Sequence, residues 1–272
     1  VISVGESGGK YCAVLDRTAF FPEQGGQYSD KGTIGDVRVT DVQIKSGEIY
    51  HYTESPLDVG REYECVIDFE DRFRKMQNHS GEHIVSGLVH SMFNLDNVGF
   101  HLGNDDVTID YNGFLTREQL LETERRANEA VVKNIPITAE YPLASELEKM
   151  QYRSKIELTD SVRIVTIPGY DVCACCAPHV ARTGEIGIIK LLDSARYKGG
   201  IRIHMLCGFD ALDDYNAKYE NIHKIALALT AKQHEAYDAV KRIIDENSEL
   251  KYRLSQMKKE LNLAKYADMD DT

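Results

Sequence analysis

The sequence predicts an α+β fold in three parts, and three patterns support this prediction. Residues 1–70 alternate apolar and polar side chains at the strand period, between pairs of turn-forming residues. Residues 71–210 mix helical and strand periods, and 211–272 carry a heptad repeat. We therefore expect a β-rich, barrel-like N-terminal lobe, a mixed α/β lobe and a C-terminal coiled-coil helical arm.

The composition is ordinary for a soluble globular protein. Of 272 residues, 42% are hydrophobic and 28% are charged, and no apolar run approaches the roughly 20 residues of a membrane-spanning helix. Val1–Gly5 shows no signal-peptide pattern, and the absence of an initiator methionine suggests a trimmed N-terminus. Six cysteines, three of them within 173–176, indicate metal chemistry rather than disulfides, and hence a reducing cytoplasm.

The net charge of −12 argues against non-specific binding along a nucleic-acid duplex. Local potential and net charge are separate quantities, so a local basic groove for one RNA end stays open. Arg196, Lys198 and Arg202, with two glycines among them, form a candidate basic cluster. Contact with phosphates and a simple basic β-turn are its two interpretations.

The first lobe contains three segments with strand patterns. Between the first two lies Thr18–Gln27, in which the adjacent glycines Gly25 and Gly26 let the backbone approach a ligand closely. From the glycines alone, a surface turn is the simpler interpretation, because turn signals are common. The expected strands are Tyr11–Leu15, Thr33–Val39 and Val42–Ile44.

A helix of about 22 residues is expected to begin near Glu70, with Asp71 as its N-cap. His79 and His83 stand four residues apart and therefore share its inner face. Alone, such a pair more commonly packs as two buried histidines, but a second pair of ligand types later in the chain favours a metal site. The apolar positions of the helix are Phe73, Met76, Ile84, Leu88 and Met92.

The second pair of ligand types is Cys175 and His179, which lie in a loop because Pro178 disfavours a helix. Three imidazoles and one thiolate form a suitable tetrahedral set for Zn²⁺. If all four bind permanently, zinc has no open position, and its role shifts to positioning or structure. Glu82 lies beside His83 and is a candidate acid or base, although an exposed helical glutamate is the simpler alternative.

Between these pairs the chain predicts further helices and strands. Thr116 and Gln119 have capping-box spacing and open a helix through about Lys133, which Pro136 ends. The cysteine loop should follow the end of a strand, so most ligands would lie on or next to regular secondary structure. The other segments are a strand and loop at Val98–Gly103, strands at Val107–Tyr111, Val162–Ile167 and Ile186–Leu192, and a short helix at Ser145–Met150.

The arm carries a seam that steps alternately by four and three residues, between flanks rich in Lys and Glu. Such a stripe needs a partner, so we expect a homodimer through the C-terminal helix, with Asn247 helping to fix the register. The seam consists of Ala236, Val240, Ile243, Asn247, Leu250, Leu254, Met257, Leu261 and Ala264.

Several motifs, taken in order, resemble the free-standing alanyl-tRNA editing proteins of the long AlaX type, which are relatives of the editing domain of alanyl-tRNA synthetase. The resemblance covers about residues 10–265 and identifies 71–210 as the zinc-containing editing domain. Long family members continue past the helical arm into another domain, so a chain that stops at 270–272 is expected to have a truncated arm. The motifs are Thr18–Pro22 with Gly25–Gln27, the His79/His83 helix, Gly99–Gly103, Cys175–His179, Thr183–Gly187 and Lys198–Arg202.

The resemblance implies a trans-editing hydrolase that deacylates mischarged seryl-tRNA(Ala), with glycyl-tRNA(Ala) as a second substrate. An alanine pocket cannot strongly reject a smaller amino acid or one that only adds a hydroxyl, so a second hydrolytic site is the usual remedy. The implied partner is the acceptor end of tRNA(Ala), and the ester would be hydrolysed at the zinc site.

Several roles follow from the resemblance alone. Thr18 would contact the serine hydroxyl, and Gln27 with the adjoining glycines would line the pocket. His101 and Arg202 would contact the substrate. The general base stays open between Glu82, His101, a zinc-bound water and the ribose hydroxyl.

Two alternatives stay open. Glu82 stands where the family often has threonine, which favours a zinc hydrolase for a different aminoacyl or amide substrate. The coiled-coil arm favours a non-enzymatic tRNA-binding or dimerisation module with a structural zinc. Replacement of Cys175 by alanine separates them, because losing a structural zinc costs folding stability outright, whereas losing a catalytic one abolishes turnover.

Overall fold

The computed structural model divides the chain into two compact units. Asp271 and Thr272, where we expected the arm to end, lie outside the described residues. The units are Val1–Leu212 and Asp213–Thr272, and the described residues are 1–7, 9–103, 107–154 and 162–270.

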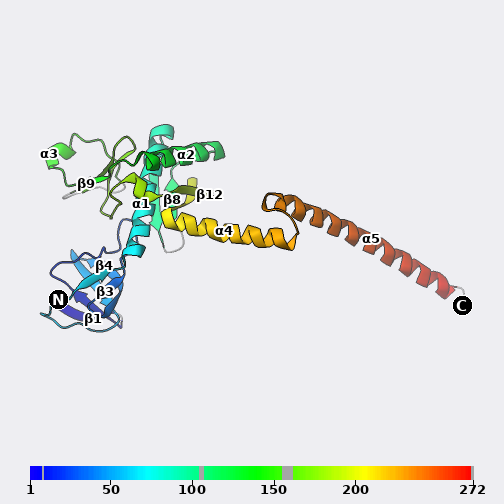
Figure 1. Ribbon diagram of the computed structural model, residues 1–272, viewed down its shortest axis with the longest axis horizontal. Helices are drawn as coiled ribbons and strands as arrows, with labels where there is room; N and C mark the ends of the chain where they lie inside the picture. The colour runs from blue at the N-terminus through cyan, green and yellow to red at the C-terminus, as the bar shows by residue number, and fades with distance from the viewer. Residues whose placement is uncertain (8, 104–106, 155–161, 271–272) are drawn as a thin grey trace. The chain divides into compact units, whose positions relative to one another are not determined.

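The N-terminal part of the first unit is an antiparallel sheet of six strands in the order β1-β2-β5-β4-β3-β6. Figure 1 shows its strands β1, β3 and β4 in blue near the N-terminus. Among the described residues no pairing joins β1 to β6, so the sheet has two edges and the expected barrel is not seen. Its core holds Phe20, Ile34, Val39 and Val42, all nearly or fully buried. The strands are β1 (Ser3–Ser7), β2 (Lys10–Val14), β3 (Gly32–Ile34), β4 (Val37–Lys45), β5 (Glu48–Thr53) and β6 (Cys65–Ile67).

Helix α1 (Phe69–Phe93) runs through the core of the first unit and is buried from Gln77 to Val89. The expected N-cap, Asp71, was wrong. Asp68 caps the helix, because its carboxylate accepts the backbone N–H of Asp71, which already lies in the first turn. The helix therefore begins a little earlier than its apolar period suggested.

A second antiparallel sheet, in the order β12-β13-β8-β7, packs with α1 and α2 into the main hydrophobic core. The capping box of Thr116 and Gln119 at the start of α2 is confirmed. The strand expected from Ile186 begins later, because Thr183–Ile186 forms a 3₁₀ turn. These elements are α2 (Arg117–Lys133), β7 (Asn97–Leu102), β8 (Val107–Tyr111), β12 (Ile189–Tyr197) and β13 (Gly200–Cys207).

A small third sheet, in the order β11-β10-β9, carries the cysteine loop at the end of β11. Arg153 lies beside β11 through a parallel bridge to Cys173. The short helix expected at 145–150 is a single turn. These elements are β9 (Thr138–Glu140), α3 (Ala144–Leu147), β10 (Ile164–Ile167) and β11 (Asp171–Ala174).

The second unit is helical. Helix α4 (Gly208–Ala228) enters it, and a 3₁₀ turn at Gln233–Glu235 leads into the long helix α5 (Ala236–Asp270). Pairing of α5 into a coiled coil stays a prediction. Within the described part of the chain, none of the helices combines the length and apolar character that a membrane span requires.

Candidate metal centre and adjoining cavity

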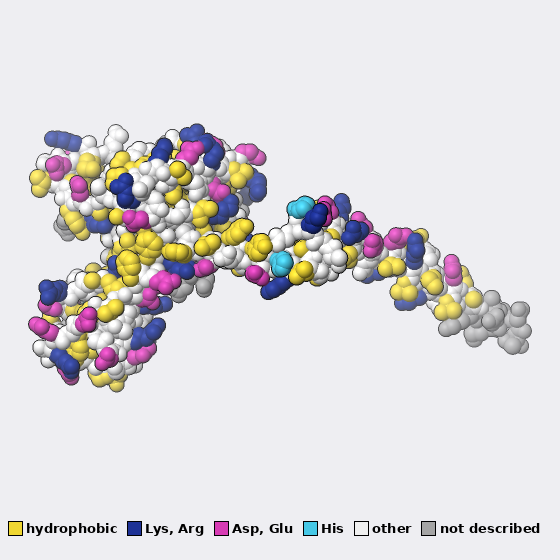
Figure 2. Space-filling model, in the orientation of Figure 1, with side chains coloured by type: hydrophobic (Ala, Val, Ile, Leu, Met, Phe, Trp, Pro, Cys, Tyr) yellow, Lys and Arg dark blue, Asp and Glu magenta, His cyan; other side chains and the backbone are white. Residues whose placement is uncertain are grey.

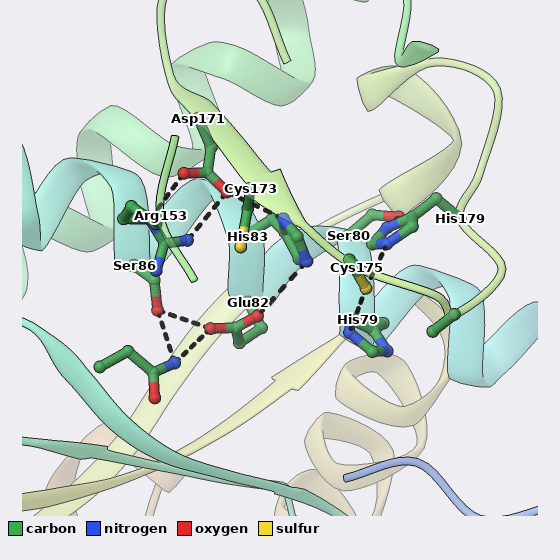
Figure 3. A network of polar contacts seen from close by, with 12 residues as sticks. His79, Ser80, Glu82, His83, Ser86, Arg153, Asp171, Cys173, Cys175 and His179 are labelled. Carbon is green, nitrogen blue, oxygen red and sulfur yellow. Dashed lines mark hydrogen bonds and ion pairs between the residues drawn. The ribbon is translucent and has the colours of Figure 1, made fainter. Parts of the chain in front are cut away.

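Four side chains place their ligand atoms within 4.8 Å of one another: His79, His83, Cys175 and His179. The Cys175 Sγ atom lies 3.5 Å from His79 Nε2 and 3.4 Å from His179 Nε2. Figure 3 shows the two histidines of α1 facing the cysteine loop. Ligands more than ninety residues apart in the chain therefore converge on a space of the size that one metal ion needs.

The cysteine loop is shaped by its own backbone contacts. Arg163 donates from its guanidinium to the carbonyl oxygens of Cys175 and Ala177, at 2.9 Å and 2.8 Å. The Cys175 N–H donates in turn to the Arg163 carbonyl at 3.0 Å. This clamp holds the turn after β11, so the thiol and His179 approach α1 from one side.

Each of the three imidazoles has its other ring nitrogen held by a different oxygen. These contacts favour a proton on Nδ1 and leave Nε2 as the free lone pair, which is the usual arrangement around metal-ligating histidines. The donor set and its outer partners therefore fit zinc. The pairs are His79 Nδ1 with Gln27 Oε1 at 2.9 Å, His83 Nδ1 with Asp171 Oδ2 at 2.8 Å, and His179 Nδ1 with Ser80 Oγ at 3.0 Å.

Asp171 links His83 to the half-buried Arg153. Arg153 donates from Nε and from a terminal nitrogen to the two Asp171 oxygens, at 2.7 Å and 2.8 Å. Although burial favours the neutral acid, His83 and Arg153 lower the pKa of Asp171. The sequence analysis missed both Asp171 and Arg153. Asp171 stands at the head of the cysteine motif, and this was the one available signal.

The cluster also sets its own protonation. Burial disfavours the Cys175 thiolate, but the surrounding imidazoles, His79 first, hold the pKa of that thiol far below its usual range. Burial lowers the pKa of His179 to about 3, so that ring is neutral at physiological pH. Burial opposes the charged form of His83, yet its hydrogen bond with Asp171 and the neighbouring Cys175 raise its pKa. The Cys175 thiolate and the neutral His179 ring are already in the state that metal binding requires, whereas the raised pKa of His83 means that a metal ion would have to displace a proton from that ring.

Glu82 is buried, with 1% of its surface exposed, so the default of an exposed helical glutamate was wrong. Its Oε1 atom accepts hydrogen bonds from Ser86 Oγ at 2.6 Å and from the Asn97 amide. Its Oε2 atom lies 3.9 Å from His83 Nε2. The carboxylate is therefore fixed beside the cluster by groups that sequence analysis did not identify.

A cavity of about 540 Å³ opens onto the cluster. Gly26 has a positive φ of 80°, and a Cβ there would lie 2.5 Å from the Phe100 carbonyl oxygen, so only glycine fits. The predicted contribution of Gly25 and Gly26 to a pocket therefore has a structural counterpart beside the ligands. The walls are formed by Gln24, Gly25, Gly26, His79, Glu82, His83, Phe100, Tyr141, Val162, Arg163, Cys173, Ala174, Cys175 and Cys176.

Gln27 does not line this cavity among the described residues, although it contacts the cluster. It is fully buried, and its Oε1 accepts from His79 while its Nε2 has no hydrogen-bond partner among the described residues. Gln27 is therefore placed to orient the His79 ring, and it is not placed to contact a substrate in the cavity.

Thr18 lies elsewhere in the first unit. Its hydroxyl is 2.8 Å from His51 Nε2, and the other His51 nitrogen is 3.1 Å from the Ala13 carbonyl oxygen. It borders a different hollow, of about 450 Å³, together with Asp16, and not the cavity beside the metal ligands. The structure therefore does not bring Thr18 together with the cluster.

His101 and Arg202 also lie outside the lining of the cavity. His101 is exposed on β7, with its ring edge-on to Tyr28 at a centroid distance of 5.4 Å. Arg202 donates to both Asp110 oxygens, at 2.6 Å and 2.8 Å, and stacks over Tyr197 at 3.8 Å. Its guanidinium is thus already paired within the sheet.

Two segments match families of known proteins. Residues 162–204 match the family described as the threonyl and alanyl tRNA synthetase second additional domain. Residues 2–71 match the class II (A) tRNA synthetases. The first match contains Cys175 and His179, and the second contains Thr18 and Gln27.

Whole-chain relatives carry consistent names. The chain is 32% identical to an alanine–tRNA ligase of Methanopyrus kandleri over 97% of its own length, and 28% identical to the alanyl-tRNA editing protein AlaX-L of Pyrococcus horikoshii over 96%. It is 33% identical to the alanyl-tRNA editing protein Aarsd1 of Mus musculus over 71%. The chain spans 30%, 67% and 49% of the lengths of these three proteins.

Proposed function

Since this chain is a relative of the alanyl-tRNA editing proteins and of alanine–tRNA ligases, as its motifs predicted, we propose that it is an aminoacyl-tRNA deacylase. Its substrate in this proposal is mischarged seryl-tRNA(Ala), with glycyl-tRNA(Ala) as a second substrate. The reaction is hydrolysis of the ester between the amino acid and the terminal ribose, in the cytoplasm.

One observation carries the proposal more than any other: a buried carboxylate lies beside four convergent metal ligands at the wall of a cavity. Glu82 Oε2 is 3.9 Å from His83 Nε2, and both side chains line the same space. A purely structural metal site has no need of a buried acid and an adjoining cavity. Sites that hydrolyse esters need both, since a water must be held and deprotonated next to the substrate.

His79, His83, Cys175 and His179 would hold zinc in this proposal. Zinc bound there would supply a positive charge next to the ester carbonyl, where negative charge develops during hydrolysis. Gln27, Asp171 and Ser80 keep the three rings oriented toward that point. The chain thus contributes a fixed ligand set, and its outer partners limit the rearrangement that binding requires.

Glu82 is our candidate for the general base. It would accept a proton from the water as the water oxygen attacks the ester carbonyl, and would return a proton to the ribose oxygen as the ester C–O bond breaks. Ser86 and Asn97 anchor one oxygen of the carboxylate, and Glu82 lines the cavity. His101 is a weaker candidate, because it is exposed and does not line the cavity.

The acceptor end of tRNA(Ala) is the proposed partner. Arg202 is paired with Asp110, so the basic-turn interpretation describes it better than a free phosphate contact. Lys198, in the left-handed conformation at the turn between β12 and β13, is the better candidate for a phosphate. A second copy of the chain, bound through α5, is the other proposed partner.

Deacylation of three purified substrates tests the proposal: seryl-, glycyl- and alanyl-tRNA(Ala). We expect serine to be released at least about tenfold faster than alanine, since an editing site must spare the correct product. Seryl-tRNA carrying the serine-specific tRNA body is the matched control for tRNA recognition. Equal loss of serine and alanine, or no deacylation by folded, zinc-loaded chain, would contradict the proposal. Hydrolysis of an aminoacyl-tRNA with a different amino acid would instead support the alternative of a zinc hydrolase for another substrate.

A further inference from the structure

Glu82 is a buried acid that depends on hydrogen-bond donors from the protein. Figure 2 shows acidic side chains scattered over the surface of the first unit, where water can solvate them. Glu82 lies beneath that surface, so its charged form is stable only if neighbouring groups replace the water. Its two donors, Ser86 and Asn97, are buried as well. The groups that hold these two donors therefore also decide where the carboxylate lies.

The orientation of Asn97 is fixed by the oxygen of its own side chain. Its Oδ1 atom accepts the backbone N–H of Gly99 at 3.0 Å, where the register of β7 against β8 shifts. A carboxamide whose oxygen is used in this way must turn its –NH₂ group toward the opposite side. That side holds Glu82 Oε1 and also Ser86 Oγ, which lies 3.0 Å from Asn97 Nδ2. Asn97 can therefore only donate to the carboxylate.

Ser86 has a single hydroxyl proton, and the groups around it determine where that proton points. In the ionised form that a general base requires, Glu82 only accepts, so Ser86 donates its proton to Oε1 at 2.6 Å (Figure 3). The Tyr111 hydroxyl lies 3.0 Å from the same Ser86 Oγ atom. Because the serine proton is already used, Tyr111 must be the donor in this second contact. The hydrogen bonds therefore run in one direction, from Tyr111 to Ser86 to Glu82.

Tyr111 is a fixed and permanent donor. It lies on β8, an inner strand of its sheet, where it pairs with Ile201 of β13. Its side chain is buried, and burial, followed by the nearby Glu82 charge, raises the pKa of its hydroxyl well above the ordinary value of 10.0. The hydroxyl therefore keeps its proton at physiological pH. Within the described part of the chain, Tyr111 is not among the residues that line the cavity.

Both donors to the carboxylate contact the same oxygen. Ser86 and Asn97 donate to Oε1, whereas Oε2 is the atom that lies 3.9 Å from the His83 Nε2 atom. The donors come from different elements, α1 and β7, so together they restrict both the position and the rotation of the carboxylate. Since a displacement of about 1 Å in an active site can lower a rate about 100-fold, this restriction matters for a general base.

We infer that Tyr111 is a positioning residue for the hydrolytic reaction, and that it acts on Glu82 through the Ser86 hydroxyl. This inference rests on the proposed function, in which Glu82 is the general base, and adds to it a residue from outside the cavity. Without the Tyr111 hydroxyl, Ser86 Oγ loses one of the groups that orient it, and its proton can turn away from Oε1. Successive hydrogen bonds in a buried chain also strengthen one another, so the loss is felt at the carboxylate.

A stability cycle tests the hydrogen bond between Tyr111 and Ser86 without any need for activity. Tyr111→Phe should raise the unfolding equilibrium constant of the full chain about fivefold, measured by urea unfolding, because one buried hydrogen bond is lost. In the Ser86→Ala background, the same substitution should not raise the constant further, since it then removes a hydroxyl that has already lost this partner. Equal effects in the two backgrounds would overturn the link between Tyr111 and Ser86.

A rate cycle tests the positioning role. Tyr111→Phe should lower the single-turnover rate of seryl-tRNA(Ala) deacylation about tenfold and leave KM unchanged, because Tyr111 acts on the base and not on substrate binding. In the Glu82→Gln background it should change the rate less than about twofold, since the group on which Tyr111 acts can no longer accept a proton. Tyr52→Phe, which removes a buried hydroxyl bonded to Lys45 in the N-terminal sheet, is the matched control and should leave the rate unchanged.

The two cycles together separate this inference from the proposed function. If the wild type deacylates seryl-tRNA(Ala) but Tyr111→Phe lowers the rate equally with and without Glu82→Gln, only the positioning role is overturned. If folded, zinc-loaded wild type deacylates none of the substrates, the proposed function is overturned and the role of Tyr111 in hydrolysis falls with it. A non-additive stability cycle would in that case still support the hydrogen bond from Tyr111 to Ser86.

Discussion

The candidate metal cluster and the seam of α5 both contain side chains that lie one helical turn apart, yet their surroundings are opposite. In the cluster, His79 and His83 are almost wholly buried, and each has a second partner on its far nitrogen. In α5, side chains such as Leu250 and Leu254 are more than half exposed. The same spacing therefore produced a closed polar site in one unit and an open apolar stripe in the other.

The difference shows which further residues the histidine pair and the apolar stripe each need in order to become buried. A ligand pair on α1 is completed by the chain itself, through the cysteine loop and through Asp171. The stripe on α5 needs a surface that the described part of the unit does not provide. Damage to the cluster should accordingly act on metal binding and chemistry, while damage to α5 should act on association alone.

The strongest test of the closed site removes a ligand. Cys175→Ala should lower zinc content and reduce seryl-tRNA(Ala) deacylation by more than the roughly 100-fold that loss of an outer partner costs. Cys65→Ser, at an exposed cysteine on β6 that does not line the cavity, is the matched control and should keep both properties. Zinc content by mass spectrometry and deacylation rate are measured on the same samples. Retention of zinc and activity by Cys175→Ala would exclude it as a ligand.

A second test separates chemistry from metal binding. Glu82→Gln keeps the shape of the side chain and its contact with Ser86 but removes the basic oxygen. We expect the single-turnover rate to fall about 10²- to 10⁴-fold with zinc content unchanged. A fall of less than threefold would mean that another group accepts the proton, and the proposed role of Glu82 would be lost.

Next in expected size is the outer partner of His83. Asp171→Asn should weaken zinc affinity about 10- to 100-fold, because the ring loses a charged acceptor and Arg153 loses its counter-ion. Asp58→Asn, an exposed residue paired with Arg61, serves as control. Competition with a chromophoric chelator gives the affinity, and equal affinities for the two variants would contradict the positioning role.

Stability against pH tests a buried histidine away from the cluster. Burial lowers the pKa of His51, so the unfolded chain binds a proton more readily than the folded chain as pH falls below the ordinary value of about 6.5. Its contribution to stability is therefore retained above that pH and lost below it. His51→Gln should flatten this part of the profile, measured by urea unfolding between about pH 7 and pH 5. If His51→Gln left the slope of unfolding free energy against pH unchanged, His51 would not be the source of this pH dependence.

The smallest effect is expected at Thr18, where the resemblance and the geometry disagree. The resemblance assigns Thr18 to the serine hydroxyl, whereas the structure pairs it with His51 outside the cavity. From the geometry, Thr18→Val should change the ratio of the serine and alanine release rates by less than about threefold. Losing a buried polar contact with the substrate would change that ratio far more. A loss of discrimination above tenfold would restore the role that the resemblance implies.

The elements that local spacing controls could be predicted from the sequence. The long helix with its two histidines, the capping box of α2 and the helix that carries the heptad seam all depend on residues within one or two turns of each other. The four ligand types could be named for the same reason, since each pair is local. Their convergence into one cluster required the fold.

The parts that could not be predicted depend on residues far apart in the chain. Gln27 reaches His79 across the first unit, and Asp171 brings Arg153 to the back of His83. The burial of Glu82 depends on Asn97, which lies on the neighbouring strand β7. The N-cap at Asp68 rather than Asp71 depends on which carboxylate meets a free N–H, and two nearby aspartates give the sequence no means to choose.

Zinc reconstitution tests the central claim most directly. Chain stripped by a chelator should be inactive, and stepwise zinc addition should restore seryl-tRNA(Ala) deacylation in proportion to bound metal, with a break at about one zinc per chain. Circular dichroism of the stripped sample checks that it is still folded. Full activity from folded, stripped chain, or no activity from chain carrying one zinc, would contradict the claim that this cluster is the hydrolytic centre.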